Sequence, residues 1–298
     1  MGKIIIRDPK GLEQKIEKMV AGGTENLHIR SNFDGTLTLT YRKGKKVPSI
    51  ISRLRQSENY ISKDYAQRAQ ELADTYRPIE YDPNIDDETK RAKMLEWWSR
   101  HYDLLKEVGL NKDILNKLIE EEDAGFRVGV REFTDLLYEN KIPMVIMSSS
   151  GIGNTIRFFL EKEGLLHSNM SILTNEVLFD EKGIMTGVKK PIIHTYNKNE
   201  IAISELPNYE EIEKRRNVLL VGDVLGDLGM MEGFKYNELI TVGFLSENVE
   251  KNLEEYKEKF DIVVLDDYSM RYVNNILKKI IKGSKKKSKT LASYIFLS

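Results

Sequence analysis

The chain has 298 residues, of which 40% are hydrophobic, and this proportion is enough to build a sizeable buried core rather than a disordered chain. Its 47 acidic and 46 basic residues give a formal net charge of -1, so no overall field attracts a nucleic acid polymer or an anionic membrane. The absence of cysteine excludes disulfides and thiolate metal sites, which leaves oxygen and nitrogen ligands for any metal.

The first 47 residues predict a helix, a short strand and a hairpin. Apolar side chains recur at helical spacing over residues 9–21, and Gly22-Gly23 would end this helix. A short strand is predicted next, at residues 27–31. The alternating residues 38–41 and the basic turn that follows them predict a β-hairpin flap.

Residues 48–140 lack apolar runs of the strand type and instead show a period of 3.6 residues. We therefore expect a helical cap, residues 48–140, inserted into an α/β core made of residues 1–47 and 141–298. Pro78 and Pro83 would lie in the loop between the first two cap helices. The predicted cap helices cover residues 62–76, 87–107, 112–121 and 128–140.

Short apolar runs bounded by turn residues return after Pro143 and alternate with helical stretches. This alternation predicts βαβ units, and hence an α/β fold with a Rossmann-like parallel sheet. A turn at residues 181–183 predicts a further hairpin over residues 176–188. The predicted strands are 144–147, 171–174, 217–221, 239–243 and 261–265, with a helix over 153–163 after the first of them.

The start of the sequence is unlike a signal peptide, because charges interrupt its short apolar run, and no apolar stretch reaches 18 residues. We therefore expect a cytoplasmic protein with no stable membrane association, and we also expect a monomer. The basic run at residues 285–289 is typical of a solvated surface, with weak contact to an anionic lipid surface as the less favoured alternative.

Polar side chains gather where the predicted strands end. Asn32 and Asp34 leave the first strand two residues apart, and Thr36 offers a hydroxyl just beyond them. Ligands of open α/β sheets bind at the carboxyl ends of the strands, so this turn is the first candidate site. Asp223 and Asp227 leave a later strand four residues apart, and their carboxylates are suitable ligands for Mg²⁺.

Two further stretches gain meaning only in combination with these. The run Ser-Ser-Ser-Gly-Ile-Gly at residues 148–153 would let backbone N–H groups approach a phosphate ahead of a helix, although such turns are more often plain helix caps. Lys198 alone is more often a solvated surface charge. It becomes a candidate phosphate ligand only beside several carboxylates.

Together, these four stretches resemble the four motifs of the haloacid dehalogenase superfamily, with a helical insertion where its first cap type belongs. Further stretches, at residues 81–83, 94–98, 167–169, 196–198 and 222–227, resemble one family within this superfamily, cytosolic 5′-nucleotidase III, also called pyrimidine 5′-nucleotidase. The resemblance to this family covers about residues 10 to 280, and one branch of the family prefers 7-methylguanosine monophosphate.

The resemblance implies Mg²⁺-dependent hydrolysis of nucleoside 5′-monophosphates, either pyrimidine or 7-methylguanosine monophosphate, through an aspartyl phosphate. Position 32, here Asn32, would be the nucleophile and a metal ligand. Asp34 would be the general acid/base and would give its backbone carbonyl to Mg²⁺. Asp223 would be the other carboxylate ligand, with Asp227 placed behind it.

The same resemblance assigns the phosphate contacts. Thr36, Ser149 and Lys198 would hold the phosphate, and Gly151 would assist through its own and neighbouring N–H groups. Lys198 would also assist the attack on phosphorus. The nucleoside monophosphate is thus the expected partner of the site.

In the cap, the resemblance implies that Glu80 hydrogen-bonds the edge of the base and that Trp98 stacks on it. Tryptophan is the residue found here in the branch that accepts 7-methylguanosine monophosphate, whose cationic purine gains cation–π attraction from an indole. Core packing is the plainer explanation of Trp97 and Trp98. Only one of two adjacent helix residues is expected to face the core, which leaves the other free for a ligand.

Asn32 departs from the family pattern, because an amide is a poor nucleophile and removes one negative charge from the metal site. We therefore predict that this chain is nearly inactive, while phosphate and nucleotide binding persist. Asn32 is either a substitution that traps substrate or the mark of a non-catalytic relative. Val224, Ile51 and Asn154 also differ from the residues usual in the family, and this wider drift favours the second explanation.

Two other functions stay open at this point. One is a non-catalytic nucleotide-binding protein on the same fold, in which restoring aspartate at position 32 would not restore turnover. The other is a phosphatase for a broad range of small phosphorylated compounds. Glu80 and Trp98 argue against the second, since they suit a substrate that carries a base.

Overall fold

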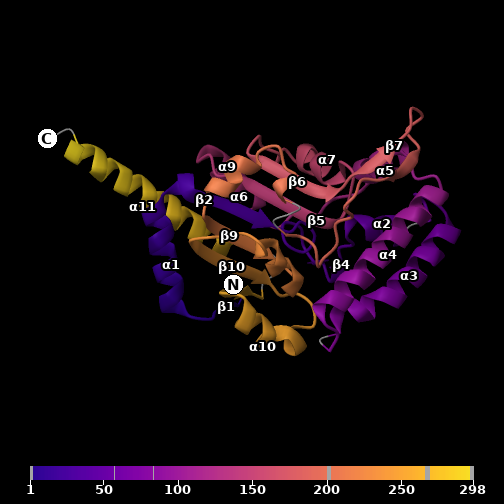
Figure 1. Ribbon diagram of the computed structural model, residues 1–298, viewed down its shortest axis with the longest axis horizontal. Helices are drawn as coiled ribbons and strands as arrows, with labels where there is room; N and C mark the ends of the chain where they lie inside the picture. The colour runs from indigo at the N-terminus through magenta and orange to yellow at the C-terminus, as the bar shows by residue number, and fades with distance from the viewer. Residues whose placement is uncertain (1–2, 57, 83, 200–202, 266–268, 296–298) are drawn as a thin grey trace.

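A seven-stranded sheet forms the centre of the molecule, as the computed structural model shows (Figure 1). Neighbouring strands are parallel except at one edge, where the first strand runs antiparallel to its neighbour, and this confirms the predicted fold class. The structure describes residues 3–56, 58–82, 84–199, 203–265 and 269–295. The strand order is β1 (Ile4–Ile6), β11 (Ile262–Val264), β10 (Glu238–Phe244), β9 (Asn217–Gly222), β2 (Leu27–Ser31), β5 (Met144–Ile152) and β6 (Met170–Asn175).

Helices cover both faces of this sheet. They are α1 (Pro9–Gly22), α6 (Val130–Glu139), α7 (Thr155–Lys162), α9 (Tyr209–Lys214), α10 (Val249–Lys259) and α11 (Arg271–Ile295). Alternate residues of a strand point to opposite faces. On β9, Leu219 and Val221 join the hydrophobic layer that contains α1 and α11, whereas Val218 and Leu220 join the layer that contains α9 and α10. Burial on both faces explains the continuous apolar run of this strand.

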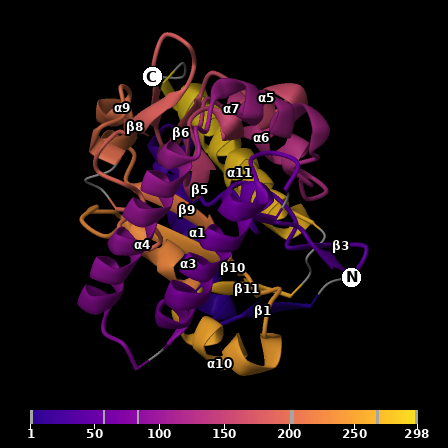
Figure 2. The same cartoon turned by 90° about the vertical axis from the view of Figure 1, so that its right-hand side faces the viewer.

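Four more helices group at one end of the sheet: α2 (Ile50–Gln56), α3 (Lys63–Tyr81), α4 (Asp87–Glu107) and α5 (Lys112–Glu121). Helices α3 and α4 lie side by side in both views (Figures 1 and 2). Both predicted hairpins are present. They are the pairs β3 (Tyr41–Arg42) with β4 (Lys45–Lys46) and β7 (Val177–Phe179) with β8 (Met185–Val188).

Helix α3 continues to Tyr81, so the prediction of a helix end at residue 76 and a loop at Pro78 was wrong. A proline inside a helix removes one backbone hydrogen bond and strains the preceding turn. Contacts from the core hold the last turn in place despite this cost. The Tyr196 hydroxyl donates to the carbonyl of Glu80 at 2.8 Å, and the Thr195 hydroxyl donates to the Glu80 carboxylate at 2.7 Å.

Strand β5 runs to Ile152, so the serine run at residues 148–150 lies within the strand rather than in a turn before a helix. The pairing of β5 with β6 shifts register between Met147 and Ile152, which lets the strand continue through this run. Helix α7 begins later than predicted, at Thr155. The local pattern of small polar residues therefore misplaced the end of the strand.

Several elements were not anticipated from the sequence. The segment after β9 forms a 3₁₀ helix, Leu225–Met231, where entry into an ordinary helix was expected. Helix α2 carries no helical pattern of polar and apolar positions, because all of its residues except Gln56 are buried. The other unanticipated elements are β1, α9, α10, a 3₁₀ turn at Thr24–Asn26 and the long helix α11, which includes the basic run at residues 285–289.

Helix α6, which the sequence placed in the cap, is bonded to the core helix α11. The Asn274 amide donates to Gly129 O at 3.0 Å and to Glu132 at 2.8 Å, and Lys278 also pairs with Glu132. The division into core and cap at residues 47/48 and 140/141 stays a prediction, and these contacts favour a cap that ends before α6. No helix among the described residues is long and apolar enough to cross a membrane.

Candidate active site

The carboxyl ends of β2 and β9 lie next to each other, and this places the two acidic turns together. Ser31 pairs with Val221 across the two strands, and the Asn32 N–H donates to Val221 O at 3.0 Å. The loop that contains Lys198 completes the cluster. Asn32 is 8% exposed, Lys198 is 3% exposed and Asp227 is fully buried, so the cluster is shielded from bulk water.

The amide of Asn32 is held by partners on both of its ends. Its Nδ2 donates to Asp223 Oδ1 at 2.7 Å and to the Asp34 carbonyl at 2.9 Å, while its Oδ1 accepts from Lys198 Nζ at 3.0 Å. Reversing the amide would place its NH₂ group against an ammonium and its oxygen against two other oxygens. The orientation is therefore fixed by its chemistry as well as by its packing.

Lys198 and Asp227 form a buried ion pair at 3.0 Å, and their side chains are 3% and 0% exposed. The second oxygen of Asp227 accepts from the backbone N–H groups of Asp223 at 3.0 Å and Val224 at 3.2 Å. Asp227 thus holds both the lysine and the turn after β9. Gly222 is required here, since an added Cβ would lie 2.6 Å from Asp227 Cβ.

The carboxylate of Asp34 is surrounded by donors from two other elements. The hydroxyl of Ser150, on β5, donates to its Oδ2. Burial raises the pKa of Asp34, while the Ser150 bond, the charges of Arg53 and Lys198 and the Ile50 N–H oppose that rise. A carboxyl group with a raised pKa is suited to donate a proton to a leaving group.

Sequence reasoning did not identify Arg53 or Ile50 as parts of this site, and it gave no individual role to Ser150, which lies in the serine run that it singled out. Ser148 and Ser150 lie two apart on β5, with their hydroxyl oxygens 3.3 Å apart, and alternation along a strand would have placed them on one face. Arg53 and Ile50 lie on the unpredicted helix α2. The carbonyl of Ser149 accepts from Asn175 at 3.0 Å, and the phosphate role of its hydroxyl stays a prediction.

The oxygen atoms at this site match the ligand chemistry of Mg²⁺, although the amide of Asn32 contributes no negative charge. The Asp34 carbonyl and Asp223 Oδ1 converge on one point, the Nδ2 atom of Asn32. Thr36, expected to hold phosphate, donates its hydroxyl to the same Asp223 oxygen at 2.9 Å. Burial, and next the charge of Asp227, raises the pKa of Asp223, so a cation beside it would favour the ionised form.

Two glycines let the backbone approach closely at this site. Gly35 has φ = +69°, and an added Cβ would lie 2.4 Å from Asp223 Oδ2. Gly151 packs against β6, where a Cβ would lie 2.2 Å from Thr174 Oγ1, and its N–H donates to the Ser148 hydroxyl at 3.1 Å. Within the described residues, no three acidic or histidine side chains form a metal-binding group, and an amide rather than a carboxylate stands at position 32.

Helices α3 and α4 of the predicted cap carry Glu80 and the pair Trp97 and Trp98. Trp97 and Trp98 are each 7% exposed, so the expectation that only one of them packs into the core was wrong. Trp97 stacks on Tyr76 of α3, with ring centroids 6.0 Å apart, whereas Trp98 stacks on His101, with centroids 6.2 Å apart. Helix α4 packs against both α3 and β8, so the adjacent side chains of Trp97 and Trp98 are both buried.

His101, behind Trp98, makes the cap sensitive to acid. Burial, with a smaller contribution from Arg55, lowers the pKa of His101 to about 3, and its Nε2 lies 2.9 Å from the Tyr65 hydroxyl. The unfolded chain binds a proton here below about pH 6.5, whereas the folded chain does not, so stability falls as the pH drops below that value.

We expect this histidine to remove about 2 kcal/mol from the free energy of unfolding between pH 7 and pH 5. The His101→Gln variant should lose that part of the pH dependence, and urea unfolding at the two pH values measures it. If the free energy of unfolding falls by the same amount between pH 7 and pH 5 in both proteins, His101 does not stay neutral in the folded state.

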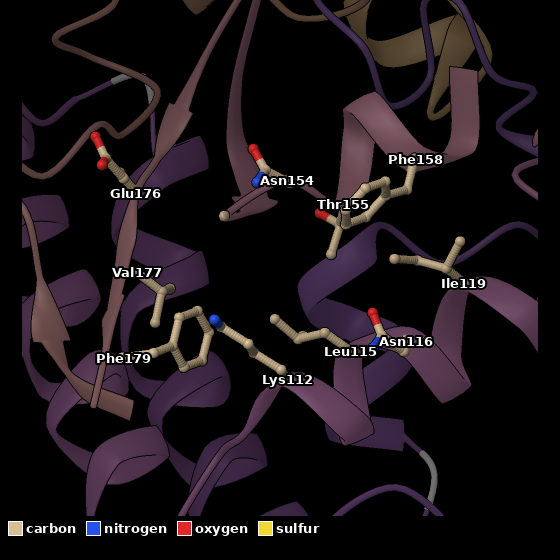
Figure 3. Close-up of a pocket in the computed structure, with 11 residues that line it drawn as sticks. Lys112, Leu115, Asn116, Ile119, Asn154, Thr155, Phe158, Glu176, Val177 and Phe179 are labelled. Atoms are coloured by element: carbon tan, nitrogen blue, oxygen red, sulfur yellow. The ribbon is translucent and has the colours of Figure 1, made fainter. Parts of the chain in front are cut away.

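A separate hollow of about 510 Å³ lies between α5, the start of α7 and β7 (Figure 3). Its walls combine apolar side chains such as Leu115, Phe158 and Phe179 with Lys112 and Asn154. None of the site residues predicted from the sequence lines it. The candidate active site is therefore the polar cluster at the strand ends and not this hollow.

Comparison with known proteins places most of the chain in one group of relatives. A model of the pyrimidine 5′-nucleotidase (UMPH-1) family matches residues 35–281. The 7-methylguanosine phosphate-specific 5′-nucleotidase A of Xenopus laevis is 39% identical over 273 residues, which cover 91% of this chain and 93% of the relative. The 7-methylguanosine phosphate-specific 5′-nucleotidase of Homo sapiens is 33% identical over 279 residues, which cover 93% of this chain and 92% of the relative.

Solved structures agree with these relatives. The crystal structure of cytosolic 5′-nucleotidase IIIB bound to cytidine matches with a TM-score of 0.83 at 29% identity, over 95% of each chain. A hydrolase of the HAD family from Salmonella enterica matches with a TM-score of 0.52 at 15% identity, over 82% of this chain and 68% of the other. That second likeness concerns the fold alone.

Proposed function

This chain belongs to the pyrimidine 5′-nucleotidase family, and from that premise we propose that its scaffold serves Mg²⁺-dependent hydrolysis of nucleoside 5′-monophosphates through a covalent phosphate at position 32. The observation that carries the proposal is the cluster of position 32, Asp34, Asp223 and Lys198 at the ends of β2 and β9. Its members meet although they are as far as 191 residues apart in the sequence.

The contacts support the role of each residue. Position 32, the Asp34 carbonyl and Asp223 would hold Mg²⁺, which would neutralise charge on the phosphate. Lys198 points its ammonium at the side chain of position 32, where a phosphate approaching that group would meet it. Asp34, with its raised pKa and its bond from Ser150, would give a proton to the leaving nucleoside oxygen.

Recognition of the nucleoside is assigned to the cap. Glu80 is a hydrogen-bond acceptor for N–H groups on the base edge, and Trp98 offers an aromatic face. The crystal structure of a relative bound to cytidine supports a nucleoside as the kind of ligand. A cationic 7-methylguanine would gain further from an indole than a neutral pyrimidine would.

Asn32 favours a second candidate function, which is nucleotide binding without turnover. Its amide satisfies acceptors on Asp34 and Asp223 and accepts from Lys198, so each end of the group suits its surroundings. An asparagine that fits on both sides is compatible with a natural binding protein. In either case, the chain as written would bind nucleotide and turn it over very slowly.

Binding by the chain as written tests the proposed substrate class. In the presence of Mg²⁺, we expect CMP or 7-methyl-GMP to bind at least about 10-fold more tightly than ribose 5-phosphate, since base stacking contributes roughly 1–3 kcal/mol. Trp98→Leu should remove most of that difference. Trp97→Leu is the control for the loss of an adjacent buried indole, because Trp97 stacks on both Tyr76 and Trp98. Calorimetric titration measures all of these affinities.

Equal affinities for the nucleotides and ribose 5-phosphate in the unsubstituted chain would contradict a base-reading cap. They would favour instead a phosphatase for small phosphorylated compounds.

A further inference from the structure

The cap and the core meet directly at the last turn of α3. Two hydroxyl groups of the core loop before Lys198 bond to one cap residue, Glu80. The Thr195 hydroxyl donates to Glu80 Oε1 at 2.7 Å, and the Tyr196 hydroxyl donates to the Glu80 carbonyl at 2.8 Å. Lys90 of α4 adds a cation–π contact, with its Nζ 5.5 Å from the centre of the Tyr196 ring.

The core loop that makes these contacts is itself rigid. The Asn197 side chain accepts from the His194 N–H at 2.6 Å and donates to Ile192 O at 2.7 Å. Thr195 packs so closely on Gly226 that an added Cβ there would lie 2.6 Å from its methyl group. A fixed loop can therefore impose a position on Glu80, which lies on a helix turn weakened by Pro78.

The two bonds leave part of the Glu80 carboxylate available. Thr195 donates to Oε1, and among the described residues no donor to Oε2 is found. Burial raises the pKa of Glu80, while the Thr195 bond and the nearby charges of Arg77, Lys198 and Lys90 oppose the rise. A carboxylate fixed through one oxygen presents the other as a directed acceptor.

We propose that the hydroxyls of Thr195 and Tyr196 form a latch between core and cap, and that this latch positions Glu80 to accept a hydrogen bond from the nucleobase. The inference rests on the proposed function for the role of Glu80. Thr195 and Tyr196 are positioning residues, since they act through Glu80. They set specificity for substrates whose base carries an N–H donor.

The latch also connects the two halves of substrate recognition. Lys198, which would hold the phosphate, follows Tyr196 by two residues on the same loop. Movement of the cap away from the core would break both hydroxyl bonds and withdraw Glu80 from the side of Lys198. Glu80 would therefore be in place to accept a hydrogen bond from the base only when the cap is in contact with this loop.

Removing each hydroxyl separately tests the latch in the full chain. Thr195→Val and Tyr196→Phe should each weaken CMP and 7-methyl-GMP binding by roughly 5- to 10-fold, the effect of one lost hydrogen bond. Ribose 5-phosphate, which lacks the base, should bind within about 2-fold of the unsubstituted chain. Thr75→Val is the matched control, because its hydroxyl bonds only to Glu71 O within α3.

A loss of affinity for ribose 5-phosphate equal to the loss for the nucleotides would overturn the proposal, because the hydroxyls would then support the fold and not base reading. Unchanged nucleotide affinities in both variants would overturn it as well.

Hydrogen exchange separates the latch from the proposed function. Without any ligand, amides near residues 79–82 should exchange at least about 5-fold faster in Tyr196→Phe than in the unsubstituted chain. If this acceleration occurs but the unsubstituted chain binds no nucleotide, the contact between core and cap stands and the proposed function fails. If exchange is unchanged, the latch itself is refuted.

Discussion

Replacing Asn32 with aspartate is expected to raise the rate of phosphate release from CMP, UMP or 7-methyl-GMP by on the order of 10⁴- to 10⁶-fold, the scale seen when a covalent nucleophile is removed. The surrounding groups are already placed for this chemistry. Lys198 Nζ lies 3.0 Å from the side-chain oxygen of position 32, and Ser150 bonds to Asp34. Colorimetric phosphate detection with Mg²⁺, for both proteins side by side, measures the change.

The same substitution should make the thermal stability of the folded chain depend on bound Mg²⁺. Nδ2 of Asn32 now donates to Asp223 Oδ1 at 2.7 Å, and a carboxylate oxygen in its place would repel that group. We therefore expect Asn32→Asp to unfold at a lower temperature than the unsubstituted chain without Mg²⁺, and to recover when Mg²⁺ is added. Asp34→Asn in the Asn32→Asp background is the control for turnover, since it keeps the new carboxylate but removes the acid/base.

Two outcomes would decide between the candidate functions. Turnover by Asn32→Asp alone would mean that the scaffold is a nucleotidase without its nucleophile. No turnover by either protein, with Mg²⁺ recovery of the Asn32→Asp melting temperature intact, would exclude the nucleotidase interpretation of this chain. Nucleotide binding without catalysis would then be its function.

The parts of the site that follow directly from strand ends could be predicted from the sequence, because they depend on local order. Asn32 and Asp34 follow the end of the short strand β2, and Asp223 follows β9 where its apolar run stops. Parallel pairing of the two strands then brings the turns together without further information. The central strands were predictable for the same reason.

Features that depend on tertiary contacts were not predictable in this way. Helix α2 has Arg53 and Arg55 buried beside Ile50 and Leu54, so it shows no polar face from which a helical period could be recognised. The last turn of α3 persists past Pro78 because hydroxyls more than 100 residues away hold Glu80. No local pattern contains either fact.

The serine run shows a third kind of limit, which is strand register. A shift of one residue along a strand moves every side chain to the opposite face. The resemblance gives Ser149 a phosphate contact, which stays a prediction, and it gives no role to Ser150, whose hydroxyl bonds to Asp34. The pairing of β5 with β6 shifts register between Met147 and Ile152, and the sequence alone carries no mark of that irregularity.

Lys198→Met is expected to lower the free energy of unfolding by about 3–5 kcal/mol, even without any ligand. The methionine would leave the Asp227 carboxylate buried and without its cation, since the two side chains are 0% and 3% exposed in the pair. It would also leave Oδ1 of Asn32 without its donor. Urea unfolding at pH 7 measures the loss.

The loss of stability should come from the unpaired, buried Asp227 carboxylate rather than from the absence of the lysine side chain itself. Adding Asp227→Asn to Lys198→Met would remove that charge while keeping an oxygen for the N–H groups of Asp223 and Val224, so the double variant should recover at least half of the stability. Lys257→Met, which breaks an exposed pair with Glu254, is the control and should cost less than about 0.5 kcal/mol. A double variant less stable than Lys198→Met would show that the Asp227 carboxylate stabilises the turn after β9 even without its lysine, and that the ion pair mainly serves phosphate binding.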